Sequence, residues 1–126
     1  MAVESGRVTS TREPVVSVRL NDAVAVECLV DTGFTGALML PRKIVGDLGI
    51  PLVGREVFEM VGQRFFTASI ALAEIDWLGQ RRTFRVVISE GMDSLIGTEM
   101  LDGNRLFVDY INDRVIITND RIIHQS

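Results

Sequence analysis

Residues 29–36 read LVDTGFTG, and the acid in this stretch stands directly after an apolar run. The run is AVAVECLV at residues 23–30, and Asp31 is followed at once by Thr32 and Gly33. An acid in this place has two interpretations. It caps a plain turn, or it belongs to a loop that carries chemistry, because functional side chains gather on loops held by a rigid scaffold. The sequence on either side of residues 29–36 helps to distinguish these two interpretations.

The segment before Asp31 predicts a β-hairpin. Residues 15–20 (VVSVRL) and residues 23–30 both follow the period of two that is typical of strands. Asn21 and Asp22 stand between them, and both residue types tolerate the positive φ that a tight antiparallel turn requires. Asp31 is therefore expected at the end of the second strand of a hairpin.

The segment after Asp31 contains one helix signal, PRKIVGDLGIP at residues 41–51. Pro41 suits the first helical position, where its missing N–H is not needed. Gly49 can end the helix, and Pro51 prevents its continuation. We expect a short helix that starts at Pro41.

The rest of the chain returns to strands. Residues 55–75 predict a long hairpin whose tip lies near Val61, Gly62 and Gln63. Trp77 lies in the next turn, DWLG, and is expected to be a partly exposed hairpin anchor. The short segment DSLIGTEML at residues 93–101 interrupts the strand pattern, and RLFVDY and RVIIT complete it. Seven or so short strands with one or two short helices predict a mainly β fold, a small closed or partly open β barrel.

The composition narrows the class of protein. With 126 residues, 47% of them hydrophobic, the chain has enough apolar material for the core of a single domain. We place that domain at residues 14–120, between polar tails at residues 1–13 and 121–126. Seventeen acidic and thirteen scattered basic residues argue against nucleic acid as a partner.

No apolar run reaches the length of a membrane span, and the first twenty residues lack a signal-peptide pattern. A cytoplasmic protein is expected. Metal ions and cofactors are not expected either, because the single histidine, His124, and the single cysteine, Cys28, are far apart in the chain and no acidic cluster has ligand spacing.

Two separated motifs resemble those of a known family. Asp31-Thr32-Gly33 follows an apolar strand, and Leu95-Ile96-Gly97 comes about sixty residues later, before a predicted short helix. Together they resemble the retroviral-type, or retropepsin-like, aspartic peptidases, and within them the prokaryotic single-domain members whose signature reads Asp-Thr-Gly-Phe. The order of the parts between the motifs, a helix and then a hairpin with glycine at its tip, is also similar. The resemblance covers residues 15–118.

The chemistry of that family implies a two-fold homodimer. Peptide hydrolysis by this route needs one carboxylate that takes a proton from water and a second carboxyl that donates one to the carbonyl oxygen. Each chain has one Asp-Thr-Gly and no Asp-Ser-Gly. The second carboxyl therefore has to come from Asp31 of a symmetry mate.

The resemblance also implies roles for the neighbours of Asp31. Thr32 would bond across the dimer axis, and Gly33 would leave its carbonyl open to the substrate. Leu95, Ile96 and Gly97 would pack behind the Asp31 loop as its support.

The substrate would lie in an extended conformation on this loop. Phe34 and Thr35 would shape its binding pockets, since they stand where retroviral enzymes carry a small and an acidic residue. The hairpin tip of Val61, Gly62 and Gln63 would be a flap that closes over the substrate.

Three alternatives remain open at this level. Asp31-Thr32-Gly33 can be a capped turn without chemistry. The same dimeric barrel can be a non-catalytic peptide-binding or structural module. A monomeric barrel that holds a small ligand is the third, and it leaves the Asp-Thr-Gly triplet unexplained.

Overall fold

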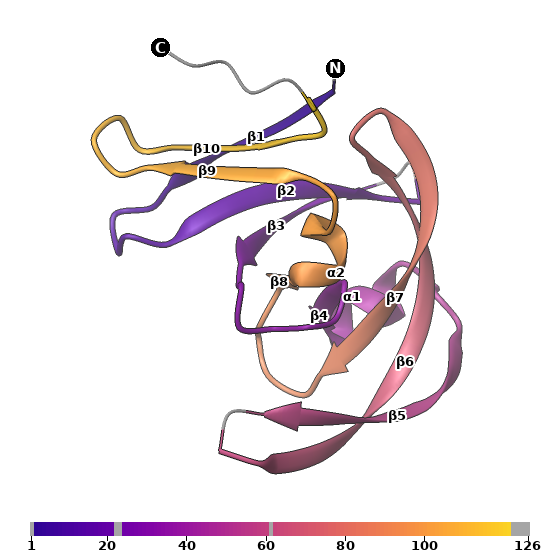
Figure 1. Ribbon diagram of the computed structural model, residues 1–126. Coiled ribbons are helices and arrows are strands. Elements are labelled where there is room, and N and C mark those ends of the chain that lie inside the picture. The colour runs from indigo at the N-terminus through magenta and orange to yellow at the C-terminus, as the bar shows by residue number, and fades with distance from the viewer. Residues whose placement is uncertain (1, 22–23, 61, 122–126) are drawn as a thin grey trace.

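The computed structural model describes residues 2–21, 24–60 and 62–121 of the chain. In that part the strands form a ten-stranded sheet, accompanied by two short helices (Figure 1). The expected mainly β fold is confirmed. The strands are β1 (Val3–Val8), β2 (Pro14–Leu20), β3 (Val24–Val30), β4 (Leu38–Pro41), β5 (Leu52–Met60), β6 (Arg64–Trp77), β7 (Gln80–Ser89), β8 (Leu95–Ile96), β9 (Arg105–Asp109) and β10 (Arg114–Thr118), and the helices are α1 (Arg42–Asp47) and α2 (Thr98–Leu101).

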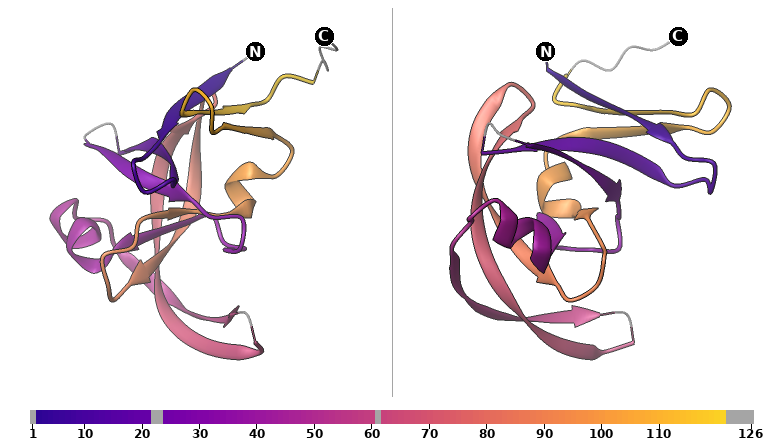
Figure 2. Two further views of the ribbon diagram at one scale, coloured as in Figure 1. Left: turned by 90° about the vertical axis from the view of Figure 1, so that its left-hand side faces the viewer. Right: turned by 180° about the vertical axis from the view of Figure 1, so that it is seen from behind.

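The strand order is β5-β6-β7-β4-β8-β3-β2-β1-β10-β9. An additional antiparallel pairing of Arg19 with Asp76 and of Leu20 with Ile75 joins β2 to β6. The paired strands from β2 round to β6 therefore surround the interior, as the front and rear views show (Figures 1 and 2). Their inward side chains form the main core, and the largest fully buried ones include Leu20, Leu38, Leu40, Ile75, Ile96 and Trp77.

The hairpin predicted before Asp31 is confirmed in the described residues. β2 and β3 pair antiparallel, with Val16 opposite Cys28 and Val18 opposite Val26. Asn21 has a φ of 48°, the left-handed conformation that the turn was expected to need. Asp22, the other predicted turn residue, lies outside the described residues.

The predicted helix is present, but it begins one residue later than expected. Pro41 has a φ of −59° and a ψ of 146°, so it is extended, and it pairs with Ser89 as the last residue of β4. The ring of proline restricts φ but not ψ, and the parallel pairing of β4 with β7 selects the extended value. Gly49 ends the helix as predicted, with a φ of +66°.

The expectation of a polar tail at residues 1–13 is wrong for residues 3–8. These residues form β1, which lies between β2 and β10 and pairs with both. Side chains such as Glu4 and Arg7 hide the strand signal, because β1 is held by backbone pairing on both edges. Gly6 lies so close to β2 that an added Cβ would be 2.9 Å from the carbonyl carbon of Val15 and closer still to its oxygen. The second predicted tail, residues 121–126, lies outside the described residues except for Arg121.

This close approach of β1 to β2 leads to a prediction with a built-in comparison. Gly6→Ala should lower the free energy of unfolding by about 1–3 kcal/mol, because the new methyl group meets the β2 backbone. Gly46→Ala adds the same methyl group within α1, where nothing lies within 4 Å, and should raise stability by about 0.5–1 kcal/mol. Urea unfolding curves measure both changes. A neutral Gly6→Ala would mean that β1 is not packed against β2.

Trp77 also differs from its expected environment. Only 1% of its surface is exposed, and its indole N–H donates to the carbonyl oxygen of Met100 at 3.0 Å. The end of the β6–β7 hairpin is thus tied to α2 rather than exposed to solvent. A buried indole needs a partner for its N–H, and the carbonyl of α2 supplies it.

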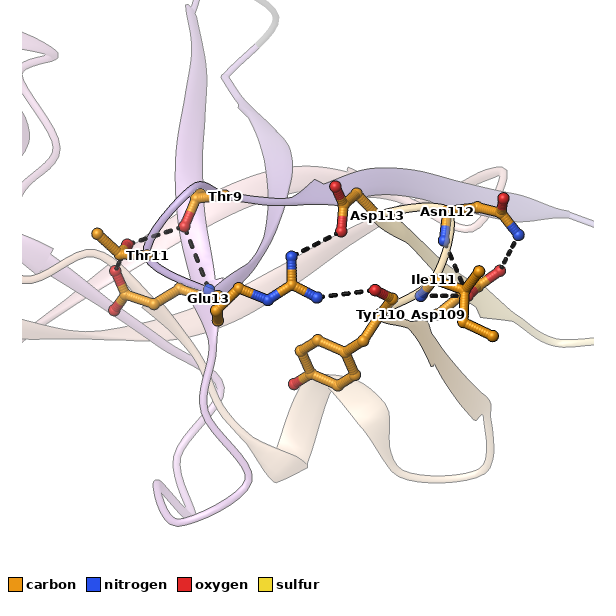
Figure 3. A network of polar contacts seen from close by, with 9 residues as sticks. Thr9, Thr11, Glu13, Asp109, Tyr110, Ile111, Asn112 and Asp113 are labelled. Atoms are coloured by element: carbon orange, nitrogen blue, oxygen red, sulfur yellow. Dashed lines mark hydrogen bonds and ion pairs between the residues drawn. The ribbon is translucent and has the colours of Figure 1, made fainter.

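Two turns at one end of the sheet are joined by Arg12. Its guanidinium donates to the carboxylate of Asp113 at 2.9 Å and to the carbonyl oxygen of Tyr110 at 2.8 Å. The Asp109 carboxylate accepts the backbone N–H of Ile111 at 2.9 Å and closes the turn after β9 (Figure 3). Figure 1 shows these turns on the side of the molecule on which β3 ends. The β1–β2 and β9–β10 connections therefore have fixed positions beside each other.

Candidate active site

Asp31 is the first residue after β3, and the strand pairing fixes its backbone. β3 runs parallel to β8, with Leu29 opposite Leu95 and Val30 opposite Ile96. The N–H of Asp31 continues this pattern by donating to the carbonyl oxygen of Ile96 at 2.9 Å. Ile96 is fully buried beneath it. The position of Asp31 is thus set by the core, although its own side chain is partly exposed.

The loop after Asp31 is joined to the segment after β8 by three backbone hydrogen bonds. Gly97 N donates to Ala37 O at 2.8 Å, Thr98 N to Phe34 O at 2.8 Å, and Glu99 N to Gly36 O at 3.2 Å. Two segments about sixty residues apart in the sequence therefore form one unit. Of the residues predicted to support the Asp31 loop, Gly97 takes part in this contact, whereas Leu95 and Ile96 pair with the end of β3 before Asp31.

Gly97 has no room for a side chain. A Cβ at this position would lie 2.6 Å from the carbonyl oxygen of Phe34 and closer still to that of Gly36. Both obstacles are backbone atoms, so a rotamer change cannot remove them. The Phe34 ring lies over Gly36, where an added Cβ would be 2.5 Å from the ring. Phe34 and Gly36 of the loop and Gly97 of the facing segment thus form one tightly packed region.

The Asp31 carboxylate faces a short turn of its own loop. Its Oδ1 accepts the backbone N–H of Gly33 at 2.8 Å. Thr32, Gly33 and Thr35 are exposed, and Phe34 is half-buried. A carboxylate that receives one backbone hydrogen bond keeps further lone pairs free for water or a substrate.

A groove with a volume of about 580 Å³ opens in front of Asp31. It lies between the Asp31 loop, the β5–β6 hairpin and the end of β7. The lining residues are Asp31, Gly33, Phe34, Thr35, Met39, Arg55, Phe58, Glu59, Phe66, Thr67, Ala68, Ser69, Ile88, Ser89, Glu90 and Leu95.

One part of this groove is apolar. The rings of Phe58 and Phe66 stack across the hairpin with centroids 5.4 Å apart. Phe34 and Met39 pack against the same small cluster, which is built on the buried Ala68, Ile70 and Val87. Such a surface suits a bulky apolar side chain of a ligand.

The hairpin tip was predicted to contact substrate, and the groove of this structure does not reach it. Gly62 and Gln63 are exposed at the turn, with φ values of 88° and 60°, and neither lines the groove. Val61 lies outside the described residues. Their contact with substrate therefore stays a prediction. The hairpin residues that line the groove, such as Phe58 and Phe66, were not singled out from the sequence, because alternation along a strand does not tell which distant loop a face will meet.

Among the charged side chains that line the groove, Glu90 is bound to an arginine. Glu90 accepts hydrogen bonds from the guanidinium of Arg42, including one from Nε at 3.3 Å. This bonding lowers the pKa of Glu90 below its ordinary value. Glu90 is therefore ionised at neutral pH and suited to hold a cation, not to donate a proton.

Cys28 is excluded as a nucleophile by its environment. It is fully buried in β3, and this burial, together with the charge of Glu27, raises the pKa of its thiol to about 12. The reactive thiolate form is thus absent at neutral pH. Within the described ranges, no group of three or more His, Cys, Asp or Glu side chains is placed to bind a metal ion. Neither described helix has the length and apolar character needed to cross a membrane.

Comparisons with known proteins add the following. No protein-family model matches the chain. An uncharacterized protein of Archaeoglobus fulgidus is 27% identical over 103 residues, which cover 77% of this chain and 80% of that protein.

Two solved structures are similar in fold. A retropepsin-like aspartic protease from Rickettsia conorii superposes with a TM-score of 0.69 at 17% identity, over 91% of this chain and 89% of that one. The EIAV protease, solved with the inhibitor HBY-793, superposes with a TM-score of 0.60 at 18% identity, over 74% of this chain and 88% of that one. The chain therefore shares the fold of retropepsin-like aspartic proteases.

Proposed function

We propose that the protein is an aspartic endopeptidase that hydrolyses a peptide bond in an extended segment lying in the groove. The observation that carries this proposal is the placement of Asp31. Its carboxylate lines the groove, while its loop is joined to residues 97–99 by three backbone hydrogen bonds. A rigid carboxylate beside a peptide-sized cleft is the minimum that water activation requires. The similarity in fold to two proteases supports the proposal.

The reaction needs a second carboxyl group, and we assign it to Asp31 of a second copy. One Asp31 takes a proton from water as it attacks the peptide carbonyl, while the protonated partner donates to the carbonyl oxygen. Glu90 of the same groove is a poor proton donor, because Arg42 holds it in the ionised form. A two-fold homodimer supplies two identical carboxyl groups without any further residue.

The neighbours of Asp31 are assigned supporting roles. The exposed hydroxyl of Thr32 would bond to the second copy, and the exposed Gly33 would offer its carbonyl to the substrate backbone. The β5–β6 hairpin would close as a flap, with its tip at Val61, Gly62 and Gln63 over the substrate. Closure would bring the tip to a groove that the hairpin already borders through Phe58 and Phe66.

We assign the chain to the prokaryotic Asp-Thr-Gly-Phe type of these enzymes, because Phe34 follows Asp31-Thr32-Gly33. Its ring fills the space over Gly36 and gives the groove an aromatic floor. The enzyme would need no cofactor, because both proton transfers use carboxyl groups. We expect it in the cytoplasm, a location that cell fractionation can test.

A mixing experiment tests the shared active site. Wild-type protein and the Asp31→Asn variant are combined at constant total concentration and incubated until subunits exchange, and cleavage of a peptide mixture is followed by mass spectrometry. If activity needs Asp31 from both copies, an equal mixture should show about a quarter of the wild-type rate, because mixed dimers are inactive. A monomeric enzyme would retain about half. No cleavage by the wild type from pH 4 to 7 would favour the non-catalytic peptide-binding module instead.

A further inference from the structure

Arg55 is the one basic side chain among the described residues that line the groove. The acidic side chains there are Asp31, Glu59 and Glu90. A groove for an uncharged peptide needs no cation. Arg55 is exposed, and its guanidinium can bind an anionic group either of the protein or of a ligand.

Within the described part of the chain, no hydrogen bond or ion pair engages the guanidinium of Arg55. Two other arginines have partners: Arg85 pairs with Glu56, and Arg42 binds Glu90 through two nitrogens. The negative charge of Glu90 is felt by both Arg42 and Arg55, but Arg42 holds its oxygens. Arg55 thus keeps its donors available at the groove.

The backbone places Arg55 at a distinct part of the groove. It lies opposite Ser69 in the β5–β6 pairing, directly after an irregularity in register between Leu52 and Gly54. Such bulges redirect the side chains that follow them. Ser69 and Ser89, both of which line the groove, are each only 8% exposed. This part of the groove is therefore polar, in contrast to the surface around Phe58.

Arg55 and Phe58 are three positions apart on β5, about 10 Å along an extended strand, and although their side chains leave opposite faces of the strand, both line the groove. An extended peptide that lies along the hairpin covers the same distance in about three residues, and its side chains three positions apart also point to opposite sides. One peptide can therefore reach the apolar part and Arg55 at the same time.

We propose that Arg55 forms a subsite for a carboxylate side chain, Asp or Glu, of the peptide that binds in the groove. The planar guanidinium can bind both oxygens of a carboxylate at once. Glu59 repels an acid elsewhere in the groove, whereas Arg42 balances the charge of Glu90, so the preference should depend on position. The inference rests on the proposed function for the identity of the ligand as a peptide, and it adds the chemical class of residue that the peptide must carry.

Binding to the 126-residue Asp31→Asn protein tests this subsite without cleavage. The probes are short fluorescent peptides with a central Phe and a single Glu, moved residue by residue, each beside a Gln version. At one position, about three residues from Phe, the Glu peptide should bind about tenfold more tightly than its Gln version by fluorescence anisotropy. Arg55→Gln should remove this difference, and Arg55→Glu should transfer the preference to a Lys peptide.

Arg114→Gln is the matched control, because Arg114 is an exposed arginine on β10 that does not line the groove. It should leave the tenfold difference unchanged. Equal binding of Glu and Gln peptides at every position, or no binding of any peptide, overturns the subsite. So does an equal loss of the difference in Arg114→Gln.

The experiments distinguish failure of the Arg55 subsite from failure of the proposed peptidase activity. Cleavage by the wild type without any preference for an acidic residue removes the subsite and leaves the peptidase. A preference in binding that Arg55→Gln abolishes, without cleavage by the wild type, establishes the subsite and removes the peptidase.

Discussion

Asp31→Asn is expected to lower the rate of peptide cleavage by about 10³-fold or more while leaving the fold and peptide binding intact. The amide has the shape of the carboxylate, but it neither takes a proton from water nor donates one as an acid, and that proton transfer is the step assigned to Asp31. The hydrogen bond from Gly33 N can still be accepted by the amide oxygen. Mass spectrometry of a peptide mixture and circular dichroism of both proteins provide the measurement.

Asp102→Asn is the control for this experiment, since Asp102 is exposed directly after α2 and does not line the groove. It should cleave at the wild-type rate. Glu59→Gln is informative as well, because Glu59 is a second carboxylate of the same groove. Loss of activity in Glu59→Gln, with a rate proportional to the wild-type fraction in mixtures with Asp31→Asn, would replace the shared site by a site within one chain.

Gly97→Val is expected to have the largest effect on the structure. A side chain here meets the carbonyl oxygens of Gly36 and Phe34, which belong to the loop that Gly97 itself hydrogen-bonds. The clash involves backbone, so the loop has to separate from residues 97–99 and lose its hydrogen bonds. We expect a loss of at least about 3 kcal/mol of unfolding free energy, together with loss of cleavage. Urea unfolding and amide exchange of Phe34 to Ala37 measure this.

Gly54→Val provides the comparison, because it introduces the same side chain in β5 at a position with nothing within 4 Å. It should be nearly neutral for stability. Gly97→Ala is a milder variant that tests the same contact if the valine protein does not fold, and it should still slow cleavage. A Gly97→Ala protein with native stability and native activity would contradict the packing described for the Asp31 loop.

The sequence predicted the parts of the fold that are encoded locally. Asn21 and the alternating residues on either side indicated the β2–β3 hairpin, since turn chemistry and strand period are properties of neighbouring residues. Gly49 marked the end of α1 for the same reason. β1 was missed because it is held by backbone pairing and by the close approach of Gly6 to β2. Neither feature produces an alternating hydrophobic pattern in the sequence.

Two kinds of information are needed to identify the candidate site: resemblance to a family, and the positions of segments that are distant in the chain. The association of Asp31 with Gly97 came from resemblance to a family, because nothing in the spacing of two motifs about sixty residues apart requires them to meet. Arg55 was not recognised, because its environment is made by β6, β7 and the Asp31 loop, which are distant in the chain. Trp77 was expected to be partly exposed because of its place in a turn, and its burial involves α2, which is distant in the chain.

The packing of Phe34 against Gly36 and Gly97 limits how this chain can change during evolution. The three nearest obstacles to a larger residue at position 36 all belong to the Phe34 ring, so a smaller residue at position 34 relieves the closest contacts there. Position 97 differs, because the obstacles there include carbonyl oxygens that every residue possesses. Paired changes at positions 34 and 36 can therefore remodel the groove floor, whereas a side chain at position 97 requires the backbone of residues 34–36 to move.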